Sequence, residues 1–370
     1  MTQRAHKTKL KICLVSISLA KGGAERSVAM LSEMLTAKGH DVHLAVLTNE
    51  IDFNHSSTLF NLGELKSEND YFFARIFRFK KLRKYLIAQD FDVIIDHRPK
   101  NNSMRELFYS NYVYKNIPTM YVIHSSNVEE YFTNNPVSMV KLYNNCLATI
   151  CVSNYIHKEI ASKLGVTNSV TIHNAFNPSW KETKSNEALI TNPYILSYGR
   201  LYDAIKDFSF LIRSFDQSNV WKQGVHLVIM GAGPDKEMLQ EFASTMNSSA
   251  FISFLPYKKD PFEIIKNAKC VTLTSIYEGF PMVLVESLSL GTPVVSLDIV
   301  SGPSEIIEHK KNGLLIKERE TENFATALHT ICTNEALYLK LKEQTLASVT
   351  QFSMQEISEK WNQLLQDVIR

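Results

Sequence analysis

Short apolar runs alternate with amphipathic helical stretches along almost the whole chain of 370 residues. Residues 10–17 form the first run, which a Gly-Gly turn joins to a stretch with apolar residues at helical spacing up to Gly39. The same order returns downstream, with apolar runs at residues 41–47, 91–97, 118–126, 148–154, 169–175, 193–198, 225–230, 270–273 and 294–297. Strand and helix alternating in this way predict an α/β fold with parallel sheets covered by helices.

The length allows two or three domains of roughly 150 residues each. Hydrophobic residues make up 45% of the chain and charged residues 21%, which is typical of a chain with a full core. The stretch from Pro178 to Asn192 is polar and has little periodicity, so we expect it to link two domains. The five cysteines are scattered without metal-ligand spacing, which favours a reducing compartment and no structural zinc.

The amino-terminal residues superficially mimic a secretory signal, because Met1 to Lys9 are basic and Leu10 to Ala20 are apolar. Lys11 interrupts the apolar run, however, and a Gly-Gly loop follows instead of a small-residue cleavage site. We interpret the start as a basic tail before a buried strand. The sequence has no uncharged apolar run of about 18 residues, so we expect no membrane-spanning helix.

One later stretch carries the strongest functional signal. Residues 270–273 read as a strand, Gly279-Phe280-Pro281 as a turn, and Met282 to Leu290 as a helix closed by Gly291. Glu278 is therefore expected on the loop and Glu286 on the helix. Such a loop presents free backbone N–H groups to anions, and carboxylates are strong acceptors for sugar hydroxyls. Phosphate and hydroxyl groups occur together in a nucleotide sugar.

These residues resemble a known signature. Glu278 and Glu286 are separated by seven residues, Gly-Phe-Pro follows the first, and Ser-Leu and Gly-Thr-Pro-Val-Val follow the second. This pattern is similar to that of retaining glycosyltransferases of the glycogen-synthase-like family, which have the GT-B fold. The resemblance implies two Rossmann-like domains facing across a cleft. Residues 1–177 would bind the acceptor, residues 193–352 the nucleotide sugar, and a final helix in residues 353–370 would cross back to the first domain.

The resemblance also implies roles for individual residues. Arg200 and Lys206 would bind the donor diphosphate, where a forked guanidinium and a mobile ammonium can neutralise two phosphates without a metal. The family usually has Lys-Gly at this point, and Lys206-Asp207 departs from that pattern. Glu278 would hold sugar hydroxyls and Glu286 the ribose hydroxyls. The remaining substrate contacts would be Gly22, Gly23, Gly231, Gly233, Tyr257, Gly279, Phe280, Pro281, Met282 and Val283.

A histidine is expected at the rim of the first domain. His124 lies in the run 118–126, at the carboxyl end of that predicted strand, the edge where α/β sheets bind ligands. The resemblance implies that His124 reaches the sugar of the donor, with His97 as the second choice. It implies a retaining transfer without an agreed protein nucleophile, in which the leaving phosphate could itself deprotonate the acceptor. We expect neither a metal nor a cofactor.

Charge is unevenly distributed between the halves of the chain. Residues 1–176 hold 21 Lys and Arg against 15 Asp and Glu, whereas residues 177–370 hold 19 against 23. Residues 72–86 combine six Lys or Arg with Phe77 and Phe79. Such a helix could lie in an anionic membrane interface, or it could bury its aromatic residues in the core and keep its cations in water. The sequence leaves both interpretations open.

The function that fits best is transfer of a hexose or N-acetylhexosamine from a nucleotide diphosphate sugar, with UDP as the default. The acceptor would be a lipid-linked oligosaccharide, lipopolysaccharide or capsule, in the cytoplasm or at the inner face of the membrane, and no nucleic acid would be bound. The alternatives are a nucleotide-sugar epimerase, a phosphorylase, which would need a pyridoxal lysine, and a non-catalytic binding or scaffold protein. A dehydrogenase is disfavoured because the dinucleotide fingerprint is absent.

Overall fold

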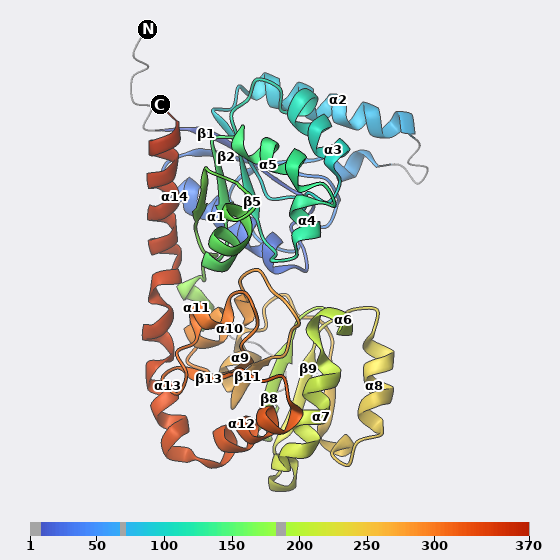
Figure 1. The fold of residues 1–370 in the computed structure, drawn as a ribbon, viewed down its shortest axis with the longest axis vertical. Coiled ribbons are helices and arrows are strands. Elements are labelled where there is room, and N and C mark those ends of the chain that lie inside the picture. Colours follow the sequence, from blue (N-terminus) through green and yellow to red (C-terminus); the bar gives the residue numbers. More distant parts are fainter. Residues whose placement is uncertain (1–8, 67–71, 183–189, 370) are drawn as a thin grey trace. The chain divides into compact units, whose positions relative to one another are not determined.

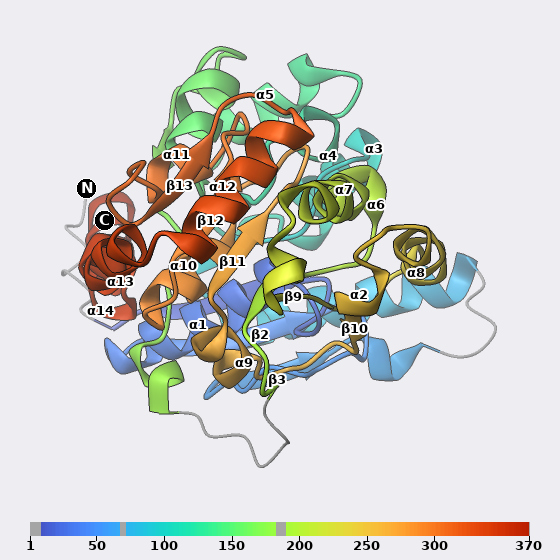
Figure 2. The same ribbon diagram turned by 90° about the horizontal axis from the view of Figure 1, so that it is seen from below.

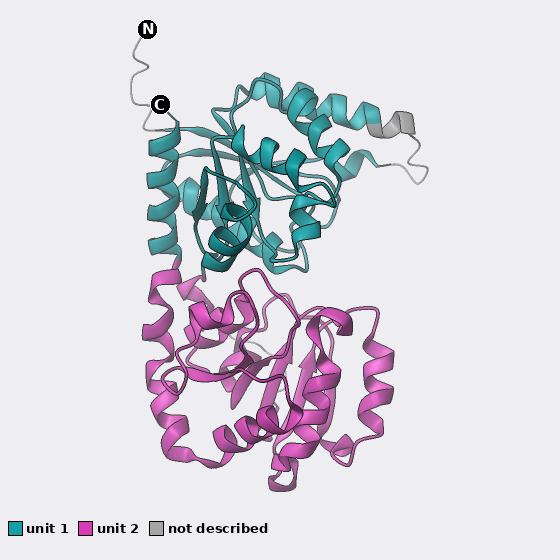
Figure 3. Cartoon of the chain, in the orientation of Figure 1, with its two compact units in different colours: residues 1–175, 354–370 teal, residues 176–353 magenta. Residues whose placement is uncertain are grey.

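The computed structural model describes residues 9–66, 72–182 and 190–369. Most of the basic tail and the centre of the expected linker therefore lie outside the described residues. The chain forms two compact units, which Figure 3 distinguishes by colour. Unit 1 comprises Met1–Ala175 and Met354–Arg370, and unit 2 comprises Phe176–Ser353.

Unit 1 is built on a parallel seven-stranded sheet with the order β3-β2-β1-β4-β5-β6-β7. Its central strands are almost entirely apolar because helices cover both faces (Figures 1 and 2). The strands are β1 (Lys11–Ser16), β2 (Asp41–Val46), β3 (Thr58–Asn61), β4 (Val93–Asp96), β5 (Thr119–Ile123), β6 (Ala148–Cys151) and β7 (Ser169–Thr171).

The helices of unit 1 connect these strands and include the last helix of the chain. They are α1 (Gly23–Ala37), α2 (Phe72–Gln89), α3 (Ser103–Phe108), α4 (Val128–Phe132), α5 (Pro136–Asn144) and α14 (Met354–Val368), with π-helical segments η2 (Tyr109–Val113) and η3 (Ile156–Ser162) and the 3-10 helix η1 (Gly63–Leu65). Helix α14 packs on α1, and Asn362 Oδ1 lies 3.1 Å from His40 Nε2 beyond the end of α1. The return of the last helix to the first unit is thus confirmed.

Unit 2 is built on a parallel six-stranded sheet with the order β10-β9-β8-β11-β12-β13. Its strands are β8 (Tyr194–Tyr198), β9 (His226–Met230), β10 (Ile252–Leu255), β11 (Cys270–Leu273), β12 (Val294–Leu297) and β13 (Gly313–Ile316). Its helices are α6 (Asp203–Lys206), α7 (Phe208–Ser218), α8 (Lys236–Ser244), α9 (Phe262–Asn267), α10 (Met282–Ser289), α11 (Pro303–Ile306), α12 (Thr321–Thr333) and α13 (Glu335–Val349), with 3-10 helices η4 (Pro178–Glu182), η5 (Val220–Gln223), η6 (Ser249–Phe251) and η7 (Thr350–Phe352). The predicted α/β class with two Rossmann-like domains is confirmed.

Two details differ from the sequence-based expectations. The expected linker begins with η4, whose Trp180 is buried and stacks on Phe262 with ring centroids 4.7 Å apart. This apolar contact outweighs the polar character of the neighbouring residues and makes the segment part of unit 2. Strand β3 was not predicted, because its four residues are only half-buried and follow a polar stretch. Within the described residues, no helix is long and apolar enough to cross a membrane.

Candidate functional site

The centre of the unit 2 sheet is its topological switch point. The chain passes from β8 outward through β9 and β10, and then returns to β11 on the other side of β8. Ligands of open α/β sheets bind outside the carboxyl ends of the strands at such a point. The loop after β8 carries Arg200, and the loop after β11 carries Glu278. Two of the predicted donor residues therefore flank the switch point.

The Gly-x-Gly turn after β9 supports the loop that carries Arg200. A Cβ atom on Gly231 would lie 1.9 Å from the carbonyl oxygen of Gly199, and one on Gly233 would lie 2.2 Å from that of Leu201. The Leu201 amide also donates to the carbonyl of Ala232 at 2.9 Å. Only glycine permits this approach of two backbones. The side chain of Arg200 itself is exposed.

Lys206 and Glu278 meet directly. Lys206 Nζ lies 2.5 Å from Glu278 Oε1, and Ser275 Oγ donates to the same oxygen at 2.6 Å. The two side chains are 24% and 16% exposed, so both remain accessible from solvent. A ligand with a diphosphate next to a sugar would supply a new acceptor to the ammonium group and hydroxyl donors to the carboxylate.

Glu286 lies in the second turn of α10 and is only 5% exposed. The hydroxyl of Tyr198, at the end of β8, donates to Glu286 Oε2 at 2.6 Å and orients the carboxylate. The preceding turn is braced by Ser301, whose hydroxyl donates to the carbonyl of Gly279 at 2.7 Å. The predicted contacts Phe280, Pro281 and Met282 are buried along this turn, Val283 is half-buried, and Tyr257 is half-buried in the loop after β10.

In unit 1, the predicted glycines lie at the start of α1. Gly22 is the residue that caps the helix, and its carbonyl accepts the amide of Arg26 at 3.1 Å. Gly23 is the first residue of the helix. The loop after β1 borders the switch point of this sheet, which lies between β1 and β4.

The two candidate histidines of unit 1 contact each other. His97 Nδ1, just after β4, lies 3.0 Å from His124 Nε2, just after β5. The outer nitrogens, His97 Nε2 and His124 Nδ1, are buried and have no hydrogen-bond partner among the described residues. Burial lowers the pKa of His124 to about 3, with a contribution from Lys100, and burial also lowers the pKa of His97 well below its usual value. The pair is therefore neutral near pH 7 and presents one donor and one acceptor at its outer nitrogens.

A fully buried charge cluster lies next to these histidines. Arg98 Nη2 lies 2.6 Å from Asp96 Oδ2 and 2.9 Å from Glu106 Oε2, and Lys100 Nζ donates to the carbonyl of Arg98 at 2.6 Å. Burial alone would raise the pKa of Asp96, but Arg98 and Lys100 outweigh it and hold the pKa below its usual value. The local sequence did not reveal this cluster, because charged residues that follow a predicted strand usually face solvent.

Three further residues of the unit 2 site were not anticipated. They are Tyr198, Ser275 and Arg319, whose guanidinium contacts Asp207 and the carbonyls of Thr274 and Ser275. Tyr198 and Ser275 lie at strand ends, where a polar side chain is a usable signal. No local pattern marks Arg319, because its partner Asp207 is 112 residues away.

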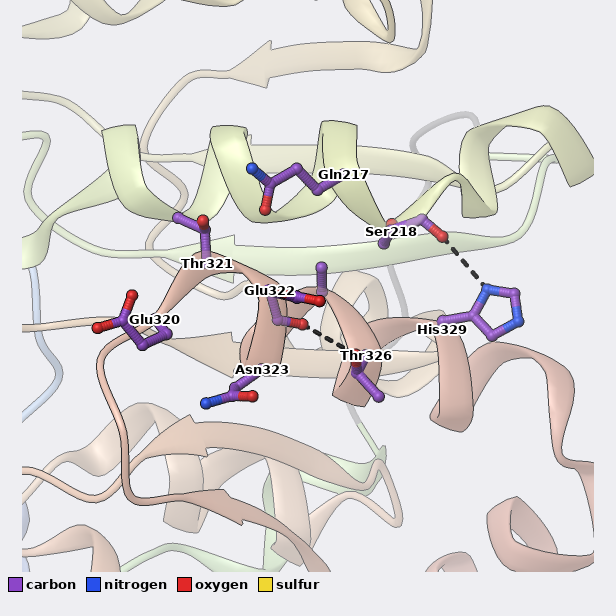
Figure 4. Close-up of a pocket in the computed structure, with 9 residues that line it drawn as sticks. Gln217, Ser218, Glu320, Thr321, Glu322, Asn323, Thr326 and His329 are labelled. Carbon is purple, nitrogen blue, oxygen red and sulfur yellow. Dashed lines mark hydrogen bonds between the residues drawn. The ribbon is translucent and has the colours of Figure 1, made fainter.

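The open hollows on the described surface include one in unit 1 and one in unit 2. One, of about 590 Å³ in unit 1, is formed by the segments that follow β4 and β5 and is lined by Asn101, Asn102, Ser103, Met104, Asn127, Glu129, Glu130, Thr133, Asn134 and Asn135. The other, of about 660 Å³ in unit 2, lies between α7 and α12, where His329 Nδ1 is 3.2 Å from the carbonyl oxygen of Ser218 (Figure 4). The second hollow contains none of the predicted donor residues. Among the described residues, no group of three His, Cys, Asp or Glu could hold a metal ion.

Family models match both halves of the chain. Residues 21–180 match the model described as Glycosyltransferase Family 4, and residues 179–347 match that described as Glycosyl transferases group 1. The chain belongs to the GT-B glycosyltransferases. A solved structure from Anabaena, HepE in complex with UDP and glucose, shares the fold with a TM-score of 0.78, 17% identity, and coverage of 97% of this chain and 100% of that one. A point mutant of TarM from S. aureus, solved in complex with UDP among other ligands, has a TM-score of 0.76 and 15% identity. The match covers 97% of this chain and 99% of that one.

Two curated relatives of this GT-B protein have a named transferase activity. It is 25% identical to the N-acetylgalactosamine-N,N'-diacetylbacillosaminyl-diphospho-undecaprenol 4-alpha-N-acetylgalactosaminyltransferase of Campylobacter jejuni, over 94% of this chain and 97% of the relative. It is 31% identical to the lipopolysaccharide 1,6-galactosyltransferase of Escherichia coli, over 55% of this chain and 56% of that relative. The chain spans about half the length or less of several other curated relatives that it matches.

Proposed function

We propose that this protein transfers a hexose or N-acetylhexosamine from a nucleotide diphosphate sugar to a growing glycan, with retention at the anomeric carbon. The observation that carries the proposal is the meeting of Lys206 and Glu278 at the β8/β11 switch point, with the buried carboxylate of Glu286 on the adjoining helix. A cation for phosphate, a carboxylate for sugar hydroxyls and a second carboxylate for ribose match the parts of such a donor.

The proposed mechanism relies on charge stabilisation. Arg200 and Lys206 stabilise the diphosphate as it departs, together with the backbone amides at the start of α10. Glu278 orients the sugar, and Glu286 holds the ribose. We assign His124 to the sugar of the donor, because a neutral imidazole suits a hydroxyl better than a phosphate. The departing phosphate accepts the proton of the acceptor hydroxyl, so the reaction needs neither a protein nucleophile nor a metal.

We place the glycan acceptor in unit 1. Its hollow after β4 and β5 is lined by five asparagines, two glutamates, a serine and a threonine. Amides and carboxylates bind sugar hydroxyls well, whereas no lysine or arginine lines the hollow to attract an anion. The named activities of the relatives from Campylobacter jejuni and Escherichia coli support a lipid-linked oligosaccharide or lipopolysaccharide as the acceptor class.

We further propose that α2 contacts an anionic membrane. Phe77 is 57% exposed and Ile87 54%, and Lys80, Lys81 and Lys84 are exposed on the same stretch of helix. Apolar burial and attraction to anionic headgroups would act together on this face. Phe79, by contrast, packs against Phe108 and Tyr109 inside unit 1. Co-sedimentation with anionic liposomes at low salt should be lost in Phe77→Ser; absence of wild-type binding would remove the proposal.

The donor can be identified by thermal shift. Purified protein is tested with UDP, GDP, ADP and CMP and with their common sugar conjugates, in the presence and absence of EDTA. A ligand that binds only the folded state raises the melting temperature, by an amount that grows with its concentration relative to Kd. We expect a shift with the uridine compounds that EDTA leaves unchanged. A shift with one other base would correct the donor, and complete loss of activity in chelator would contradict metal independence.

The competing function is a non-catalytic nucleotide-sugar-binding or scaffold protein, and an epimerase of the same fold is a further alternative. Incubation with the identified donor and a polyprenyl diphosphate sugar separates them. Transfer that disappears in Glu286→Ala excludes the scaffold, and formation of an epimeric nucleotide sugar without transfer would favour the epimerase.

A further inference from the structure

Arg319 joins the two segments that carry the proposed donor residues. It lies between β13 and α12, far from both segments in sequence. Its Nη1 donates to Asp207 Oδ2 at 2.7 Å and to the carbonyl of Thr274 at 3.0 Å, and its Nη2 donates to the carbonyl of Ser275 at 2.5 Å. The planar guanidinium thus binds a side chain of one segment and the backbone of the other.

Each of these contacts lies next to a donor residue. Asp207 directly follows Lys206, and Ser275 donates its hydroxyl to Glu278 at 2.6 Å. Two further hydrogen bonds join the same segments. Thr274 Oγ1 donates to the carbonyl of Lys206 at 3.0 Å, and the amide of Ile276 donates to the carbonyl of Ile205 at 2.7 Å. A displacement of one segment would therefore change the distance between Lys206 and Glu278.

Asp207 has an unfavourable backbone conformation and a charged side chain, and Arg319 contacts that side chain. Asp207 has φ 50° and ψ 50°, the left-handed region that glycine adopts without strain and that other residues adopt only at an energetic cost. Its carboxylate accepts the amide of Phe210 at the start of α7 and binds Arg319. Without Arg319, an unpaired carboxylate would lie beside the lysine that receives the diphosphate.

We infer that Arg319 is a positioning residue of the donor site. It neutralises Asp207 and holds the loop of Ser275 and Glu278 against Lys206, so that a nucleoside diphosphate bound to a sugar meets one cation and one oriented carboxylate. This inference rests on the proposed function, because it assigns the arginine to the same donor.

Four variants test the inference: Arg319→Ala, Asp207→Gly, the double variant, and Lys317→Ala as the matched control, which removes an exposed cation two residues away in the same loop. Affinities are measured for the nucleotide sugar, the nucleoside diphosphate and the nucleoside without phosphate. We expect Arg319→Ala to weaken binding of the nucleotide sugar about tenfold and to leave the nucleoside unchanged. The double variant should recover to within about threefold of the wild type, because glycine fits the left-handed backbone and removes the unpaired charge.

A merely structural role would give a different pattern. The inference is wrong if Arg319→Ala weakens binding of the nucleoside as much as binding of the nucleotide sugar. It is also wrong if the double variant binds the nucleotide sugar no more tightly than Arg319→Ala. Should Arg319→Ala fail to fold, Arg319→Lys replaces it, because lysine retains the charge but lacks the forked guanidinium. This variant should weaken binding of the nucleotide sugar and leave binding of the nucleoside unchanged. If the wild type binds no nucleotide at all, the proposed function fails and the inference fails with it, whereas normal wild-type binding with an unaffected Arg319→Ala overturns the inference alone.

Discussion

The two units use charged residues differently at the carboxyl ends of their strands. In unit 1, Asp96, Arg98 and Lys100 are fully buried and paired with one another, and the neighbouring histidines are neutral. In unit 2, Lys206 and Glu278 are paired but partly exposed, and Arg200 is exposed. Buried pairs cannot exchange partners without a large desolvation cost, whereas exposed ones can. The charges of unit 1 therefore stabilise a loop, and those of unit 2 remain available to a ligand.

The largest expected effect is that of Arg98→Ala. Removing this guanidinium leaves Asp96 and Glu106 buried without their partner, which should lower the free energy of unfolding by about 3–5 kcal/mol. Urea denaturation followed by circular dichroism measures the change. Lys163→Ala, which breaks an exposed pair with Glu159, is the control and should leave the midpoint unchanged. Equal midpoints for both variants would show that the buried cluster is not what stabilises unit 1.

Lys206→Ala should show the opposite behaviour. We expect kcat/KM to fall by about 10²–10³, the usual effect of removing one group that stabilises developing charge. The melting temperature should change little, because both partners of the pair reach solvent. Lys266→Ala, at an exposed position on α9, is the control for loss of a cation. A large loss of stability with unchanged kcat/KM would mean that the exposed pair is structural, as in unit 1.

Gly231→Ala should separate donor binding from stability within unit 2. Its Cβ atom would lie 1.9 Å from the carbonyl oxygen of Gly199 and would displace the loop that carries Arg200. We expect the KM for the donor to rise about tenfold. Gly224→Ala is the matched control: Gly224 has φ +79° and no atom near the added Cβ, so that variant should lose about 1 kcal/mol of stability and keep its KM. An unchanged KM in Gly231→Ala would show that the loop position does not affect the donor.

The smallest effect concerns the neutral histidines of unit 1. In the unfolded chain His124 has a pKa of about 6.5, and burial lowers it to about 3 in the folded protein, so the unfolded chain binds more protons at mildly acidic pH. The contribution of this histidine to the free energy of unfolding is therefore fully present above about pH 6.5. It falls as the pH decreases toward 3, by at most about 1.4 kcal/mol per pH unit for each histidine. His124→Gln should flatten this slope in urea titrations between pH 6.5 and 5. An unaltered slope would show that His124 is not shielded as the structure indicates.

The fold could be read from the sequence because its signals are local. Apolar runs between helical stretches identified all the strands at the centres of the two sheets, and the Gly-Phe-Pro turn located the start of α10. The placement of Glu278 on a loop and Glu286 on the following helix also depended only on neighbouring residues. Strand β3 escaped prediction because a half-buried edge strand lacks the continuous apolar pattern of a central one.

The details of the site depend on contacts between distant residues, which no local pattern reveals. Tyr198 and Glu286 are 88 residues apart, and Lys206 and Glu278 are 72 apart. The sequence also could not show that Arg98 and Lys100 are buried, because charged residues in a turn usually face water. In α2, Phe79 packs inside unit 1, as the core interpretation predicts, and Phe77 is exposed.

The return of α14 to unit 1 has a consequence for synthesis of the chain. Ile357 and Trp361 of this helix line the same small cavity as His97 and His124, so unit 1 lacks part of its packing until residues 354–370 have been made. Unit 2, in contrast, is one continuous segment that is complete at Ser353. During translation unit 2 can therefore finish folding before unit 1, although most of unit 1 is synthesised earlier.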